Sequence, residues 1–195
     1  IDSAITNVAE RDDASRLISV WAAGNDRIAG GVNTGDCVAV SGRRNLYGGC
    51  ISDEASAKNN IAVGAVDRIN GRVELADFSS IGPTRDGRIK PDLVADGVLN
   101  SPSVSWDSGS GEDSYTNTPI KGTSFSAPNV SGIISLLVEH AKKGHINKRY
   151  QPATIKALLA HSATDLGNEG PDFYFGWGLV NAEEAVSTMD QHGNS

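Results

Sequence analysis

The sequence predicts an α/β fold in which a mostly parallel sheet is covered by helices on both faces. Apolar residues recur at helical spacing in residues 2–13, and a strand-like apolar run follows at 17–23. A second short buried strand is expected at 60–66, and a later apolar run predicts a buried helix that extends to about Lys143. Helices that alternate with mostly apolar strands are typical of a parallel sheet buried on both sides.

Further elements follow along the chain. They are a loop at 26–58, a half-exposed strand at 73–78, turns at 79–90, a short strand at 91–95 and a polar, solvated loop at 100–121. Pro152 begins another helix, and Asn181 with Glu184 predicts a capping box for a last helix that ends near Met189. Residues 1–190 then form one unit, and 191–195 form a frayed tail.

Composition limits the partners of the chain. The 195 residues are 38% hydrophobic and 21% charged, which is typical of one ordered domain. A net charge of −7 without a basic stripe argues against nucleic acid or an anionic membrane surface. No apolar run approaches the ~20 residues of a membrane span. The chain begins at Ile1 rather than Met, so we interpret it as a piece of a longer protein.

Two cysteines, Cys37 and Cys50, lie close together in the polar, glycine-rich loop. A disulfide between them would suit an exported protein, and two reduced thiols are an equal alternative from the sequence. No Cys or His neighbours them at the spacing of metal ligands, so they do not predict a metal site.

Residues 122–132 read Gly-Thr-Ser-Phe-Ser-Ala-Pro-Asn-Val-Ser-Gly and place Ser124 at the head of the long helix. Unpaired backbone N–H groups converge at a helix N-terminus and favour negative charge there. A serine nucleophile needs such a place, because its substrate becomes an oxyanion. Pro128 is expected in the first turn, where its missing N–H has no cost. The alternative is a serine-rich N-cap on an ordinary core helix.

This segment closely resembles the nucleophile segment of the subtilisin-like serine proteases, the subtilases. Four further stretches resemble the family in matching order and spacing, between about residues 1 and 186. They are 22–25, 61–66, 78–83 together with 90–95, and 176–182.

The resemblance implies roles for individual residues. Ser124 is the expected nucleophile, and the Asn25 side chain with the Ser124 backbone N–H is expected to hold the oxyanion. Read alone, Asn25 would be an ordinary turn residue. Ala22, Ala23 and Gly24 are expected to line one wall of the pocket for a protein or peptide substrate. No catalytic cofactor is implied, although oxygens in 26–36 and 107–117 could hold the structural calcium that subtilases often bind.

The family's catalytic Asp and His motifs are absent from this sequence. His140 lies sixteen positions after Ser124 on the same helix, ~24 Å away, and His145, His161 and His192 lie still further along the chain. We therefore expect the C-terminal part of a secreted, periplasmic or cell-surface peptidase domain, without its first strands. It would be inactive without the upstream half of that domain. The alternatives are a pseudoprotease or binding module that keeps the fold, and a peptide ligase.

Overall fold

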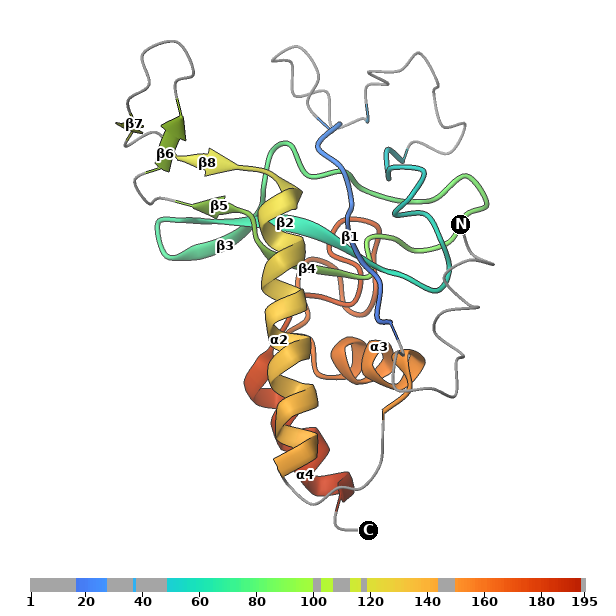
Figure 1. The fold of residues 1–195 in the computed structure, drawn as a ribbon. Coiled ribbons are helices and arrows are strands. Elements are labelled where there is room, and N and C mark those ends of the chain that lie inside the picture. Colours follow the sequence, from blue (N-terminus) through green and yellow to red (C-terminus); the bar gives the residue numbers. More distant parts are fainter. Residues whose placement is uncertain are drawn as a thin grey trace.

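A computed structural model provides the coordinates of the protein. It describes residues 17–27, 37, 49–99, 103–106, 113–116, 119–143 and 150–193. The helix predicted at 2–13 lies outside these residues. Figure 1 shows a small sheet with helix α2 (Thr123–Lys143) running across it and helices α3 (Pro152–His161) and α4 (Ala182–Gly193) near the far end of α2.

The sheet is built around strand β2 (Ile61–Ile69), with strand β1 (Val20–Ala22) on one side and strand β4 (Leu93–Asp96) on the other. Both neighbours run parallel to β2. The first six residues of β2 are all buried, which accounts for their apolar composition. The predicted α/β class with a parallel-containing sheet is confirmed.

Strand β2 is longer than the sequence analysis predicted and turns into a hairpin. Asn70 and Gly71 both have positive φ, 52° and 78°, and lead into strand β3 (Arg72–Leu75), which pairs with β2 in antiparallel fashion. An Asn-Gly pair is the favoured two-residue hairpin turn, because it accepts left-handed backbone at both positions. The half-exposed strand predicted at 73–78 is this β3.

The prediction of a loop at 100–121 was partly wrong. Two short antiparallel pairs occupy part of it. Strand β5 (Val98–Leu99) pairs with β8 (Ile120–Lys121), and β6 (Ser103–Trp106) pairs with β7 (Asp113–Thr116). An antiparallel ladder is made by backbone groups, so the polar composition of this segment gave no signal for it.

Three helices complete the described structure: α2 (Thr123–Lys143), α3 (Pro152–His161) and α4 (Ala182–Gly193). The Asn181 cap is confirmed, since its Oδ1 accepts a hydrogen bond from Glu184 N at 3.0 Å. Helix α4 continues past Met189 to Gly193. Among the described residues, no helix is both long and apolar enough to cross a membrane.

Helix α2 begins earlier than expected, and the position predicted for Pro128 was wrong. Pro128 is the sixth residue of α2 and therefore lies beyond the first turn. The proline has no N–H to donate to the carbonyl four residues earlier, which is that of Ser124. The carbonyl of Ser124, the second residue of the helix, therefore receives no hydrogen bond from the residue four positions later.

One apolar core joins the helices to the sheet. Helix α2 packs across β1, β2 and β4 through Val130, Ile134 and Leu137, which are at most 7% exposed. The other buried members come from alternate positions of β2 and β4, from the end of α2, and from α3 and α4: Ile61, Val63, Leu93, Ala95, Ala141, Ile155, Leu159, Ala185 and Met189. This packing fixes the start of α2 against the end of β1.

A buried ion cluster lies beneath the start of β4. Lys90, whose side chain is 2% exposed, places its Nζ 2.5 Å from Asp92 Oδ2 and 2.8 Å from Asn60 Oδ1. Asp92 Oδ1 lies 2.8 Å from Lys156 Nζ of α3, and Asp92 Oδ2 accepts from Ala62 N at 2.7 Å. One carboxylate thus links β2, β4 and α3, because a buried charge is tolerated only where it is paired and hydrogen-bonded.

The Lys90→Met substitution is expected to remove a gain in stability at alkaline pH. Burial lowers the pKa of Lys90 in the folded protein to about 8, whereas an unfolded lysine titrates near about 10.4. Between these values the unfolded state binds more protons, so the free energy of unfolding rises with pH, by up to about 3 kcal/mol. Below about pH 8 both states are protonated and this gain is absent.

Urea unfolding of the wild type and of Lys90→Met across this window measures the effect. The difference between their free energies of unfolding should grow in favour of the wild type from about pH 8 upward. A difference that stays constant with pH would contradict the lowered pKa of Lys90.

Asp92→Asn is the companion variant, and its unfolding in urea is measured in the same way. It leaves two lysines facing each other without a carboxylate and should cost about 3–5 kcal/mol at neutral pH.

Candidate active site

Ser124 and Asn25 lie together where β1 ends and α2 begins. Ser124 is the second residue of α2, and Asn25 follows β1 by three positions. Both residues are exposed, whereas Thr123, which lies between them in space, is fully buried. The resemblance predicts that Asn25 and Ser124 act together, and the fold brings them to the same place.

The side-chain amide of Asn25 has a defined orientation. Its Oδ1 accepts hydrogen bonds from Thr123 N at 2.9 Å and from Thr123 Oγ1 at 3.0 Å. A backbone N–H can only donate, so the atom that faces Thr123 N must be the carbonyl oxygen. The Nδ2 of Asn25 is therefore left to donate to another acceptor.

Gly122 keeps the space beside this donor open. A Cβ on Gly122 would lie 3.6 Å from Asn25 Nδ2 and 3.8 Å from Ser124 N. Both nitrogen atoms thus border one point that no side chain of the described residues fills. Ser124 N also lies in the first turn of α2, where backbone N–H groups have no helical acceptor. Two donors that converge beside a serine hydroxyl can stabilise an oxygen that gains negative charge.

Thr123 holds the two segments together, a role that the sequence analysis missed. Its hydroxyl donates to Asn25 Oδ1 and accepts from Gly24 N at 3.3 Å. The same side chain therefore fixes both the backbone before Asn25 and the amide of Asn25. A Gly-Thr pair directly before the proposed nucleophile was the only available signal, and it does not reveal a partner 98 positions away.

The structure limits how the proposed pocket wall could contact a substrate. Ala23 is fully buried, its N donates to Val63 O, and its O accepts from Ser52 N. Gly24 N is bonded to Thr123, and Gly24 O accepts from Ser80 N at 2.9 Å. The N–H groups of Ala23 and Gly24 are both used within the protein, so neither residue has a backbone donor left for a substrate. Ala22, the last residue of β1, is half-buried.

No histidine in the described part of the chain accompanies Ser124. His140 Nε2 lies 2.7 Å from Asp190 Oδ1, which ties the far end of α2 to α4. His161 is the last residue of α3, and His145 lies outside the described residues. His192 lies near the end of α4. Within the described residues the Ser124 hydroxyl has neither a base nor another hydrogen-bond partner.

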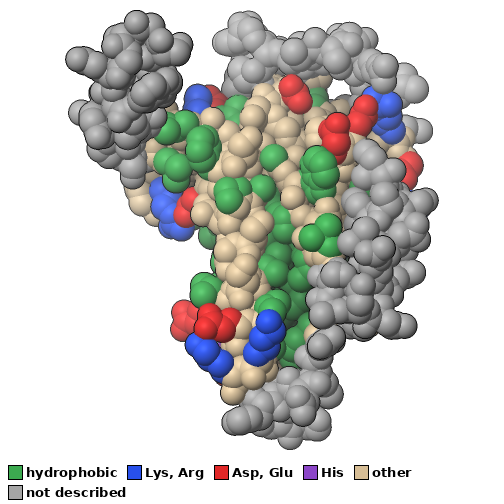
Figure 2. All heavy atoms as spheres, in the orientation of Figure 1, with side chains coloured by type: hydrophobic (Ala, Val, Ile, Leu, Met, Phe, Trp, Pro, Cys, Tyr) green, Lys and Arg blue, Asp and Glu red, His purple; other side chains and the backbone are tan. Residues whose placement is uncertain are grey.

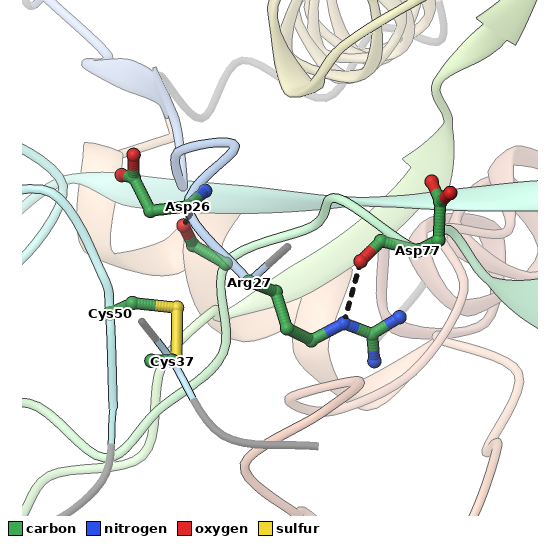
Figure 3. Close-up of a disulfide and its surroundings, with 6 residues drawn as sticks. Asp26, Arg27, Cys37, Cys50 and Asp77 are labelled. Carbon is green, nitrogen blue, oxygen red and sulfur yellow. Dashed lines mark hydrogen bonds between the residues drawn. A yellow bond between two sulfur atoms is a disulfide. The ribbon is translucent and has the colours of Figure 1, made fainter. Parts of the chain in front are cut away.

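The structure joins Cys37 and Cys50 in a disulfide, which lies close to Asp26 and Arg27 (Figure 3). Cys50 N donates to Ile81 O at 2.8 Å, so the bridge is attached next to Ser80, which is hydrogen-bonded to Gly24 and Asp26 on either side of Asn25. Among the described residues, no group of three or more His, Cys, Asp or Glu side chains could hold a metal ion. Most of the oxygens proposed for calcium, in 26–36 and 107–117, lie outside the described residues.

A family model described as the subtilase family matches residues 1–178 of the chain. Serine protease AprX of Bacillus subtilis is 34% identical over 149 residues, which are 70% of this chain and 31% of that protein. Subtilisin DY of Bacillus licheniformis is 29% identical over 184 residues, which are 94% of this chain and 52% of that protein. The chain thus spans about half or less of the length of these curated relatives.

Solved structures show the same similarity. The CspB protease of Clostridium perfringens superposes with a TM-score of 0.57 at 29% identity, covering 72% of this chain and 29% of that one. The patellamide maturation protease PatA superposes with a TM-score of 0.58 over 90% of this chain and 52% of that one. At 23% identity, this second match supports the fold alone.

Proposed function

The chain belongs to the subtilase family, and from this we propose that it carries the acylation half of a serine endopeptidase. Ser124 is the nucleophile of this proposal, and Asn25 and the Ser124 backbone N–H stabilise the oxyanion. The observation that carries the proposal is the Asn25 amide, which is oriented by Thr123 so that its donor borders the open space beside Ser124 N.

The reaction follows from these groups. The Oγ of Ser124 attacks the carbonyl carbon of the scissile peptide bond while a base removes its proton. The carbonyl oxygen gains negative charge and accepts hydrogen bonds from Asn25 Nδ2 and Ser124 N. When the tetrahedral intermediate collapses, the leaving amine takes a proton, and an acyl-enzyme remains on Ser124 for water to hydrolyse.

The base and its orienting carboxylate come from the upstream half of the domain in this proposal. None of the four histidines stands in a sequence context that fits the base, and His140 is engaged with Asp190. The outward face of α2 is available to such a partner. Ser131, Gly132 and Ser135 are exposed, Leu136 is 62% exposed, and Figure 2 shows few charges along most of this face. Strand β1 also lies at the edge of the described sheet.

Substrate, location and calcium are extensions of the same proposal. The substrate is a protein or peptide. The protein acts outside the cytoplasm, as a secreted, periplasmic or cell-surface enzyme, and the disulfide supports this location because such bridges persist in oxidising compartments. A structural calcium ion in 26–36 or 107–117 is proposed from family resemblance.

A fluorophosphonate probe tests the proposal directly. The chain alone should show negligible labelling and negligible peptide hydrolysis, because Ser124 has no base. The complete catalytic domain, meaning this chain joined to its upstream half, should be labelled at Ser124 and should hydrolyse a peptide. Mass analysis of the modified peptide identifies which serine is labelled. Ser126, which lies two positions after Ser124, is the internal control and should stay unlabelled.

The other outcomes separate the alternatives. Strong labelling of the isolated chain at Ser124 would show that the base lies within it. An unlabelled and inactive complete domain that still binds peptides would favour a pseudoprotease or binding module. Products joined to an added amine, seen by mass, would favour a peptide ligase.

A further inference from the structure

The segment 24–27, which contains Asn25, is hydrogen-bonded to residues 76–80 at several points. Ser80 N donates to Gly24 O at 2.9 Å, and Asp26 N donates to Ser80 Oγ at 3.1 Å. Gly24 has a φ of +116°, and a Cβ there would lie 2.7 Å from Ser80 Oγ, so the two segments approach as closely as glycine permits. These contacts hold the backbone on both sides of Asn25.

Arg27 supplies the rest of the attachment. Its N donates to Phe78 O at 3.3 Å, its Nε donates to Asp77 O at 3.0 Å, and its Nη2 donates to Ala76 O at 2.8 Å. The guanidinium thus spans two successive carbonyls, and Figure 3 shows it extended toward Asp77. This residue lies two positions after Asn25, where the described part of the loop ends.

We propose that Arg27 is a positioning residue that holds the Asn25 amide where it donates to the oxyanion. Thr123 fixes Asn25 from the side of α2, and Arg27 fixes the same loop from the side of residues 76–78. The inference rests on the proposed function, because it assigns Arg27 an effect that acts only through Asn25.

The chemistry of the site favours arginine at this position. A planar guanidinium presents several donors in fixed directions and can reach two carbonyls at once, whereas a lysine ammonium acts as a single point. Partial burial lowers the pKa of Arg27, and the neighbouring Asp77 and Tyr174 oppose that shift. The Asp77 carboxylate itself lies 3.5 Å from Lys121 Nζ, so Arg27 binds the carbonyls and leaves the carboxylate to Lys121.

A double-mutant cycle in the complete catalytic domain tests this role. Arg27→Met keeps the aliphatic stem and removes the donors. It should lower kcat about 10- to 100-fold with little change in KM. A displaced Asn25 amide stabilises the transition state less, whereas it contributes little to binding of the substrate in its ground state. In an Asn25→Ala background the same change should lower kcat less than about threefold, since the positioned group is already gone. Arg27→Lys should restore part of the loss.

Arg88→Met is the matched control. Its Nη2 also donates to a backbone carbonyl, Ser56 O at 2.8 Å, but among the described residues it has no hydrogen bond to residues 24–27, the segment that contains Asn25. It should leave kcat unchanged. Equal losses from Arg27→Met with and without Asn25 would assign Arg27 a general structural role and overturn the proposal, as would an unchanged kcat. Loss of kcat in Asn25→Ala without loss in Arg27→Met refutes only the Arg27 inference, whereas an unaffected Asn25→Ala refutes the oxyanion site itself.

Discussion

Replacement of Ser124 by alanine is expected to lower kcat of the complete catalytic domain by about 10⁶-fold, the size of the loss in subtilisin itself rather than a value derived from this geometry. The substitution removes the atom that forms the acyl-enzyme, while the oxyanion donors and the substrate contacts remain. KM should therefore change little. Steady-state hydrolysis of a peptide substrate measures both constants, and fluorophosphonate labelling should disappear.

Ser126→Ala provides a control two positions along the same helix. Ser126 is fully buried, and its hydroxyl has no hydrogen-bond partner among the residues that the structure describes. Removal of an unpaired buried hydroxyl leaves the free energy of unfolding unchanged or raises it, because the folded state no longer pays the free-energy cost of desolvating that hydroxyl. Full activity in Ser126→Ala with none in Ser124→Ala assigns the chemistry to Ser124. Residual turnover in Ser124→Ala close to that of the wild type would mean that another group is the nucleophile.

Replacement of Asn25 by alanine is expected to lower kcat by about 10²- to 10³-fold with little change in KM, a magnitude that also comes from subtilisin. The amide donates to an oxygen that is charged only in the transition state and intermediate, so its loss should spare ground-state binding. Asn25→Asp should be at least as severe, because a carboxylate has the same shape but cannot donate and repels the oxyanion. The two constants are again measured by steady-state kinetics.

The Asn181→Ala variant separates this effect from a loss of stability. Asn181 caps α4 through its bond to Glu184 N, and removal of such a cap typically costs about 1 kcal/mol. This variant should unfold at a lower denaturant concentration and keep its kcat. If Asn25→Ala lowered stability to the same degree and lost no more activity than Asn181→Ala, the oxyanion role would be refuted.

The elements that depend on local apolar patterns could be predicted from the sequence. The runs of β1, β2 and β4, the long helix after Ser124 and the Asn181 cap all carry their signal within a few residues. The ladders of β5 to β8 could not be predicted, since they depend on backbone pairing between polar segments. The end of α4 was placed too early, because nothing after Met189 except composition marked it.

The candidate site divides in the same way. Ser124 and Asn25 could be proposed as site residues because the residues around them resemble a family pattern. Thr123, Arg27 and the Lys90–Asp92–Lys156 cluster were not found, because each acts through a partner that is distant in the chain. Arg27 meets carbonyls about 50 positions away, and Lys156 meets the backbone of Asn60 at a separation of 96. A single sequence does not show such contacts between residues that are distant in the chain.

The bond between Thr123 N and Asn25 Oδ1 also has a consequence for the order in which the protein is built. It joins residues 98 positions apart, one just after β1 and the other at the start of α2. Contacts that close so long a loop form only after much of the chain has become compact. In the proposed site, Ser124 therefore acquires its oxyanion donor late, so a nascent or half-folded chain has the serine hydroxyl without the donor that the proposed reaction needs.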